Sequence, residues 1–197
     1  MLTESYFSAT SDKPLVYETI GACFDRIAEQ HGARDGLIVR HQSVRWSYAQ
    51  YRTQVDRFAA GLVALGIGKG DRVGMWAPNC TEWCLTQFAT AKIGAILVCI
   101  NPAYRTFELE FALNKSGCVA LVTAQKYLTS DYVGMLRELA PELLESEPGK
   151  LKAKRLPALR HIIATGDTAP SGMWKFAQVA AMGEGAISRL PEITKSL

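Results

Sequence analysis

Two short apolar runs separated by a helix-length segment constrain the fold of this chain most. Residues 72–77 form one run, which Pro78 ends, and residues 95–100 form the other, which Asn101-Pro102 ends. Runs without alternating polar residues are typical of strands that are buried on both faces of a parallel sheet. The intervening segment has apolar residues at helical spacing and stops at Gly94. The pattern therefore predicts a βαβ unit with a right-handed crossover.

Two further apolar runs extend this sheet. They lie at residues 118–122 and 159–164, and helix-length segments separate all four runs. Strands that alternate with helices predict an α/β fold, here a doubly wound, mainly parallel sheet with flanking helices. All four strands are expected to be buried.

Capping residues indicate where the helices begin. Thr19 can cap a helix over residues 20–30, and Ser47 can cap a long helix that Gly66 ends. Asn79 and Glu82 have the spacing of a capping box for the helix inside the βαβ unit. Shorter elements are predicted from the same signals: a β-hairpin from residues 37–39 and 44–46, a helix over residues 107–115 capped by Thr106, and a helix over residues 173–182.

The chain divides into three predicted parts. Residues 1–47 are expected to form an N-terminal arm, a helix and the hairpin, with the arm covering residues 1–16. Residues 48–166 are expected to form the α/β subdomain that contains the parallel sheet. Residues 167–197 are interrupted by Gly and Pro, and we interpret them as a C-terminal segment.

Composition excludes some classes of protein and indicates a compartment. The net charge of +3 is too small to argue for nucleic-acid binding, and no apolar run reaches the ~20 residues of a transmembrane helix. The number of cysteines is odd, and Cys84, Cys99 and Cys118 lie in apolar segments, where we expect buried thiols. With no signal peptide evident, these features predict a reduced, cytoplasmic protein.

Several segments, taken in order, resemble the adenylate-forming superfamily, and within it the acyl-CoA synthetases (fatty-acid–CoA ligases). The resemblance rests on Trp46-Ser47-Tyr48, Gly70-Asp71-Arg72-Val73, Ala77-Pro78-Asn79 and residues 91–105. Residues 101–105 with 108–110, then 148–151 and 155–159, are similar to the subgroup called acyl-CoA synthetase family member 2. The likeness runs from about Tyr17 to the end of the sequence.

The resemblance implies a two-step reaction and its substrates. A carboxylic acid, a fatty acid in the branch that the chain resembles, attacks ATP to give an acyl-adenylate and pyrophosphate, and the thiol of CoA then displaces AMP. Mg²⁺ accompanies ATP, and this part of the fold could also carry a homodimer surface. The family's Gly/Thr/Ser-rich ATP loop and its catalytic lysine have no counterpart in this sequence. We therefore expect the N-terminal part of an acyl-CoA synthetase, inactive by itself, with no catalytic residue, metal ligand or tightly bound cofactor.

Arg105 is the one candidate binding residue. It follows a predicted strand end and precedes a predicted helix, a place where free backbone N–H groups also attract anions. In the family that the chain resembles, the segment after this Asn-Pro lies near the CoA nucleotide. Some relatives have arginine directly after the proline, where this chain has Ala103. Arg105 is thus expected either to contact a CoA phosphate or to form a surface or capping salt bridge.

Other interpretations stay open at this point. A non-catalytic binding or dimerisation module could have the same fold, and aryl-CoA ligases and other adenylating enzymes share this region. A dinucleotide-binding oxidoreductase needs G-x-G-x-x-G after the first strand, which Ala77-Pro78-Asn79 does not provide. The glycine cluster at residues 66–70 follows a helix and precedes a strand, the reverse of a phosphate loop, and is interpreted as a turn.

Overall fold

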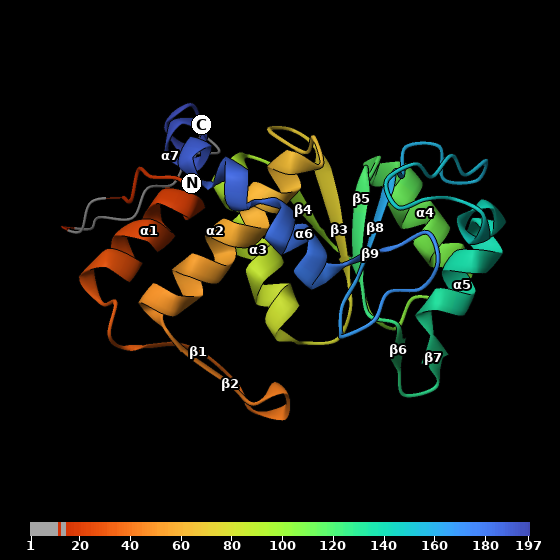
Figure 1. Ribbon diagram of the computed structural model, residues 1–197, viewed down its shortest axis with the longest axis horizontal. Helices are drawn as coiled ribbons and strands as arrows, with labels where there is room; N and C mark the ends of the chain where they lie inside the picture. The colour runs from red at the N-terminus through yellow and green to blue at the C-terminus, as the bar shows by residue number, and fades with distance from the viewer. Residues whose placement is uncertain (1–11, 13–14) are drawn as a thin grey trace, which may run out of the picture.

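The computed structural model describes residue 12 and residues 15–197. Most of the arm predicted for residues 1–16 therefore lies outside the described residues. In the described part, a twisted sheet stands in the centre with helices on either side of it (Figure 1). The α/β fold predicted from the apolar runs is confirmed.

Five parallel strands form the central sheet. Their order across the sheet is β4-β3-β5-β8-β9, and every neighbouring pair is parallel. The strands are β3 (Arg72–Trp76), β4 (Ile96–Cys99), β5 (Ala120–Thr123), β8 (His161–Ala164) and β9 (Trp174–Lys175). β5 and β8 are buried along their whole length. The predicted parallel pairing of the apolar runs is thus confirmed.

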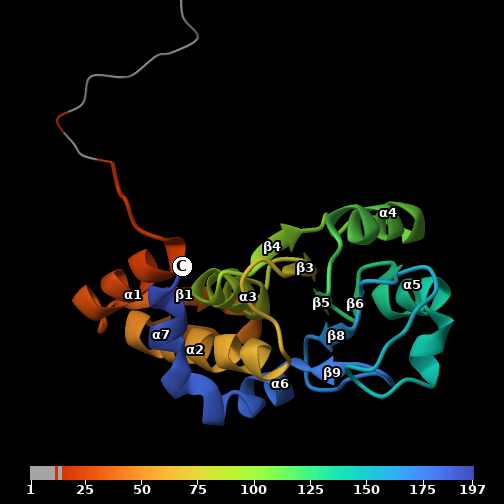
Figure 2. The ribbon, with the colours of Figure 1, turned by 90° about the horizontal axis from the view of Figure 1, so that it is seen from above.

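Helices cover both faces of this sheet, as the view in Figure 2 shows. One face carries α1 (Ile20–Gln30), α2 (Tyr48–Ala64), α3 (Thr81–Ile93) and α6 (Phe176–Met182). The other face carries α4 (Thr106–Ser116) and α5 (Tyr132–Leu139). Near the end of the chain, η3 (Glu184–Arg189) and α7 (Leu190–Lys195) lie beside the first group. Among the helices of residues 15–197, none is both long and apolar enough to cross a membrane.

The connections place a topological switch point between β3 and β5. The chain leaves β3 through α3 on one face and leaves β5 toward α5 on the other, and these two strands are neighbours in the sheet. In open α/β sheets, ligands bind outside the carboxyl ends of the strands at such a point. The fold therefore directs attention to the carboxyl edge of the sheet.

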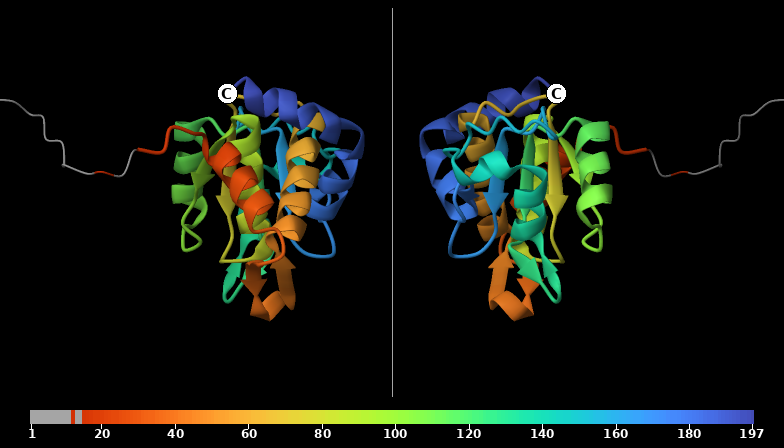
Figure 3. Two further views of the ribbon diagram at one scale, coloured as in Figure 1. Left: turned by 90° about the vertical axis from the view of Figure 1, so that its left-hand side faces the viewer. Right: turned by 90° about the vertical axis from the view of Figure 1, so that its right-hand side faces the viewer.

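Two small hairpins project beyond this carboxyl edge (Figure 1 and Figure 3). One consists of β1 (Asp35–Val39) and β2 (Val44–Ser47), joined by the short 3-10 helix η1 (Arg40–Gln42). The other consists of β6 (Lys126–Tyr127) and β7 (Ser130–Asp131). After α5, the 3-10 helix η2 (Pro141–Leu144) begins the connection to β8.

Aromatic pairs fasten the helices to one another and to the sheet. Phe58 of α2 stacks on Phe176 of α6 with ring centroids 3.9 Å apart, and Phe24 of α1 stacks on Phe88 of α3 at 4.3 Å. Trp76 at the end of β3 is fully buried. Because these residues come from separate elements, their contacts hold the layers in one arrangement.

Strand β4 corrects the expectation that all four apolar runs are buried. In the described chain β4 is the terminal strand of the sheet, Ile96 is half exposed, and Cys99 is exposed rather than a buried thiol. An apolar run shows that a strand is suited to burial on both faces. The position of that strand in the sheet depends on pairing with residues far away in the sequence. The run itself does not encode this pairing.

Helix boundaries were predicted well where the signal was local. α1 and the Ser47 cap of α2 are confirmed, and Gln50 completes a capping box with Ser47. The predicted Asn79 cap is wrong, because Cys80 is the N-cap residue of α3 and has no capping side-chain bond. The predicted helix at 173–182 is shorter, since its first residues form β9.

The glycine cluster after α2 is a turn, as predicted. Gly66 and Gly70 both have positive φ angles, of 78° and 84°. That backbone conformation costs little for glycine and is strained for most other residues. The cluster lies at the amino end of β3, on the side of the sheet opposite the switch point.

Candidate functional site at the carboxyl edge of the sheet

The loop of residues 100–105 connects β4 to α4 at the carboxyl edge. Asn101 shapes this loop, because its side-chain Oδ1 accepts a hydrogen bond from the Ala103 N–H at 2.9 Å and its carbonyl accepts one from the Tyr104 N–H at 3.0 Å. Asparagine favours such turns because its short side chain can bond the backbone two residues on. The loop is therefore ordered by its own sequence.

Two stacked aromatic side chains hold the same loop through hydrogen bonds to its backbone. The rings of Trp76 and Tyr132 stack with centroids 4.1 Å apart. Trp76 Nε1 donates to the Asn101 carbonyl at 3.1 Å, and the Tyr132 hydroxyl donates to the Pro102 carbonyl at 2.8 Å. Burial raises the pKa of Tyr132, and the charge of nearby Arg105 opposes that rise. The hydroxyl thus keeps its proton and remains a donor at neutral pH.

Arg105 occupies the N-cap position of α4. The helix begins at Thr106, so the prediction that Thr106 is the cap is wrong by one residue. Glu108 accepts a hydrogen bond from the Arg105 backbone N–H at 3.1 Å, which satisfies one free donor of the helix start. Within the described part of the chain, the exposed Arg105 side chain has no ion-pair partner. A cation and the N-terminus of an eleven-residue helix therefore face solvent together.

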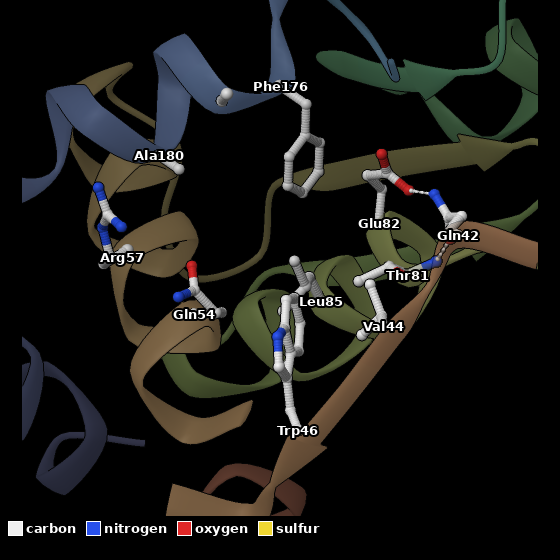
Figure 4. A pocket seen from close by; sticks show the side chains of 11 residues that line it. Gln42, Val44, Trp46, Gln54, Arg57, Thr81, Glu82, Leu85, Phe176 and Ala180 are labelled. Atoms are coloured by element: carbon white, nitrogen blue, oxygen red, sulfur yellow. Dashed lines mark hydrogen bonds between the residues drawn. The ribbon is translucent and has the colours of Figure 1, made fainter. Parts of the chain in front are cut away.

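A cleft lies on the other side of the switch point, between the β1–β2 hairpin, α2, α3 and α6 (Figure 4). Its volume is about 290 Å³. Trp46, Leu85 and Phe176 supply apolar walls, and Gln54 and Arg57 supply polar groups at one end. Arg57 also pairs with Glu184 at 3.3 Å. The cleft can hold a small, largely apolar group.

Gln42 at the hairpin tip closes one end of this cleft. Its Oε1 accepts a hydrogen bond from the Thr81 N–H at 2.6 Å, and its Nε2 donates to Glu82 Oε2 at 2.9 Å. Gln42 thereby takes the capping role that the sequence suggested for Asn79. The buried Thr81 hydroxyl has no hydrogen-bond partner among the described residues.

Sequence reasoning found Arg105 and missed the groups that position its loop. Trp76 was predicted only as part of the buried run of residues 72–77, and Tyr132 and Gln42 gave no signal of their own. Gln125, which follows β5, was also missed. Its Nε2 donates to the Thr168 carbonyl at 2.6 Å and ties the ends of β5 and β8 together. The structure brings Arg105 near Tyr132.

The candidate site combines the Arg105 cation with the backbone N–H groups at the start of α4. Arg105 and the start of α4 fit a phosphate group by charge and by free N–H donors. Among the described residues, no group of three or more His, Cys, Asp or Glu side chains could hold a metal ion.

Comparisons with known proteins identify the family of this chain. The model of the family described as AMP-binding enzyme matches residues 24–147, which is more than half of the chain. The mitochondrial medium-chain acyl-CoA ligase ACSF2 of Rattus norvegicus is 41% identical over 180 residues, covering 91% of this chain and 29% of the relative. A putative acyl-CoA synthetase of Bacillus subtilis, YngI, is 40% identical over 160 residues, covering 81% of this chain and 29% of the relative.

A solved structure shares the fold. The putative long-chain-fatty-acid CoA ligase from Rhodopseudomonas palustris superposes with a TM-score of 0.66 and 25% identity, covering 82% of this chain and 36% of that one. This chain thus spans 29% of the length of each of the two curated relatives named above.

Proposed function

This chain belongs to the family of AMP-binding enzymes, and from that premise we propose that it is the N-terminal part of an ATP-dependent acyl-CoA synthetase. The full-length enzyme would convert a carboxylic acid, ATP and CoA into acyl-CoA, AMP and pyrophosphate through an acyl-adenylate. The names of the rat and Bacillus subtilis relatives support this reaction class. A fatty acid is the proposed acid, and an aromatic acid is the alternative.

In this proposal, this part of the enzyme binds CoA. Arg105 would contact a phosphate of CoA, and the start of α4 would add backbone N–H donors. The single observation that carries this assignment is the loop of residues 100–105, which the stacked Trp76 and Tyr132 hold through hydrogen bonds to two successive carbonyl groups. A loop held in this way keeps its arginine in one place and lowers the entropy that is lost on binding.

The adenylation chemistry is assigned elsewhere in the full-length enzyme. Mg²⁺ would accompany ATP and neutralise charge on its phosphates when bound. No step that we assign to this chain passes through the ion. The cytoplasmic location and the division at residues 47 and 166 stay predictions. The rat relative is named a mitochondrial protein.

Substitution of Arg105 in a full-length enzyme that carries this sequence tests the proposal. Arg105→Ala should raise the Michaelis constant for CoA about tenfold, because one charge-assisted hydrogen bond is lost, and should leave the constants for ATP and the acid nearly unchanged. Arg105→Lys should recover part of the loss. Arg189→Ala is the matched control, because Arg189 is an exposed arginine in η3 at the other end of the molecule.

Two results would count against this assignment. If Arg105→Ala changed the Michaelis constants of all three substrates equally, Arg105 would act on the fold rather than on CoA. If it changed none of them, the side chain would be a surface group. Absence of any CoA-dependent turnover in the unsubstituted full-length enzyme would reject the reaction itself.

A further inference from the structure

The cleft between the β1–β2 hairpin, α2, α3 and α6 is held in shape by contacts among its own walls. Gln42 bonds both Thr81 and Glu82 and so joins the hairpin to α3. Phe176 of α6 stacks on Phe58 of α2 with ring centroids 3.9 Å apart. The cleft volume of about 290 Å³ is close to the lower limit of ligand pockets, which is about 300 Å³. A preformed cleft of this size suits a small molecule.

The Thr81 hydroxyl is the polar group that this cleft leaves unsatisfied. Thr81 is 5% exposed, and its Oγ1 has no hydrogen-bond partner among the residues that the structure describes. The other buried side-chain atoms of the described chain that lack a partner belong to residues outside the cleft. A buried hydroxyl without a partner costs free energy, and a ligand that bonds the hydroxyl removes that cost. The cleft therefore favours a ligand with a hydrogen-bonding group at this end.

The charges at the two ends of the cleft determine which groups the ligand carries. Glu82 lies beside Thr81, and its carboxylate repels a second anion, so a neutral hydroxyl fits this end. Arg57 lies with Gln54 at the opposite end (Figure 4). The ion pair of Arg57 with Glu184 is solvent-exposed, and such a pair contributes little, so a ligand anion can replace Glu184. The Arg57 end therefore accepts a carboxylate.

Two aromatic side chains border the space between these ends. Trp46 and Phe176 point toward one another from opposite sides of the cleft, and Leu85 adds an aliphatic wall (Figure 4). An aromatic ring packs well against such walls, and a rigid ligand loses less conformational entropy on binding than a flexible chain does. The centre of the cleft therefore favours a single flat ring.

We propose that this cleft binds a small aromatic acid that carries a hydroxyl group on the side of the ring opposite its carboxylate. The carboxylate pairs with Arg57, the ring lies between Trp46 and Phe176, and the hydroxyl forms a hydrogen bond with Thr81. The acid is bound as a ligand, and no bond is made or broken. The residues that line the cleft do not include the loop of residues 100–105, so this site is separate from the one assigned to CoA.

Isothermal titration calorimetry of the 197-residue chain with two matched probes tests this site. The probes are para-hydroxyphenylpropanoate and phenylpropanoate, which differ only in the hydroxyl group. We expect the hydroxylated acid to bind with a dissociation constant between about 10 µM and about 1 mM, a range that a ligand of this size reaches. Phenylpropanoate should bind about tenfold more weakly, because it leaves the Thr81 hydroxyl unpaired.

Two isosteric substitutions on α3 separate binding from folding. Thr81→Val removes the unpaired hydroxyl and keeps the shape, so it should weaken binding of the hydroxylated acid about tenfold, bring the two probes to equal affinity, and leave the melting temperature undiminished. Thr86→Val is the matched control, because the buried Thr86 hydroxyl bonds the Glu82 carbonyl at 2.7 Å and Thr86 does not line the cleft. This variant should lower the melting temperature and leave both affinities unchanged.

A second pair of variants tests the carboxylate end. Arg57→Gln should weaken binding of both probes at least about tenfold, because a charge-assisted hydrogen bond is lost. Arg52→Gln is the control, since Arg52 lies on the same helix but does not line the cleft. A full-length enzyme that carries this sequence should bind both probes with the same affinities as the chain does. Circular dichroism checks that each variant folds.

Three results would overturn the proposal. The first is no binding of the hydroxylated acid at millimolar concentration. The second is equal affinity for the two probes, or binding that neither Thr81→Val nor Arg57→Gln weakens. The third is binding by the chain but not by the full-length enzyme, which would show that the rest of the polypeptide fills the cleft. CoA-dependent turnover by the full-length enzyme is measured separately, so each of these results would leave the function proposed above intact.

Discussion

The Tyr132 hydroxyl donates a hydrogen bond to the Pro102 carbonyl at 2.8 Å, and the ring of the same residue stacks on Trp76 with centroids 4.1 Å apart. One side chain on α5 therefore joins the end of β3 to the loop that precedes α4. Through this contact the core of the protein sets the position of Arg105.

Removal of that hydroxyl should separate the two roles of Tyr132, the stacking on Trp76 and the hydrogen bond to Pro102. Tyr132→Phe keeps the stacking on Trp76 and loses the bond to Pro102, so the free energy of unfolding should fall by about 1 kcal/mol, the usual net value of such a bond. Urea titration of the chain measures this change. In a full-length enzyme the same variant should raise the Michaelis constant for CoA more than that for ATP. Unchanged stability would show that the hydroxyl bonds water equally well.

The aromatic contact between α1 and α3 should be a large source of stability. Phe88 is partly buried, stacks on Phe24, and lies edge-on to Tyr51 at 5.7 Å. Phe88→Ala should lower the free energy of unfolding by about 3 kcal/mol, the low end for aromatic truncation in a core. Phe107→Ala is the control and should change it by less than about 0.5 kcal/mol, because Phe107 is exposed. Equal losses in both variants would contradict this assignment.

Burial of His161 should make stability depend on pH. Burial, helped by the charge of Arg160, lowers the pKa of His161 from its ordinary value near 6.5. Below that pH the unfolded chain binds a proton that the folded chain does not, so stability should fall as the pH drops below about 6.5, by at most about 1.4 kcal/mol per pH unit.

Paired unfolding curves at pH 7.5 and 5.5 isolate this effect. His161→Gln should reduce the difference in unfolding free energy between the two pH values. His41→Gln should leave the difference as it is in the unsubstituted chain, because His41 is exposed at the hairpin. A fall in stability toward pH 5.5 that survives in His161→Gln would assign it to other groups. Asp56 would not be one of them, because burial raises its pKa despite its contact with Lys92, and a carboxyl group of this kind makes stability rise as the pH drops.

Local signals predicted most of the fold because they act over a few residues. Ser47 and Gln50 form a capping box, and apolar runs gave β3, β5 and β8. Non-local choices were not predicted. Which strand stands at the edge depends on the pairing of all five, so β4 was wrongly expected to be buried.

The candidate site was predicted only in part, for a similar reason. The sequence placed Arg105 at a strand end and a helix start, because both signals are local. The groups that hold its loop come from distant segments: Trp76 from β3 and Tyr132 from α5. Gln42 likewise caps α3 from a hairpin far away in the sequence. No local pattern marks such residues before the fold brings them together.

The most direct test of the account is acid-dependent exchange of pyrophosphate into ATP. The assay would use the 197-residue chain and a full-length enzyme that carries it, each with short, medium and long carboxylic acids. We predict exchange by the full-length enzyme and none by the chain above a control without protein, because catalysis at nucleotide phosphates depends on positioned N–H donors and cations that we assign to the rest of the enzyme. Acid-dependent exchange by the chain alone, proportional to protein and lost on heating, would contradict the account, as would a full-length enzyme without any exchange.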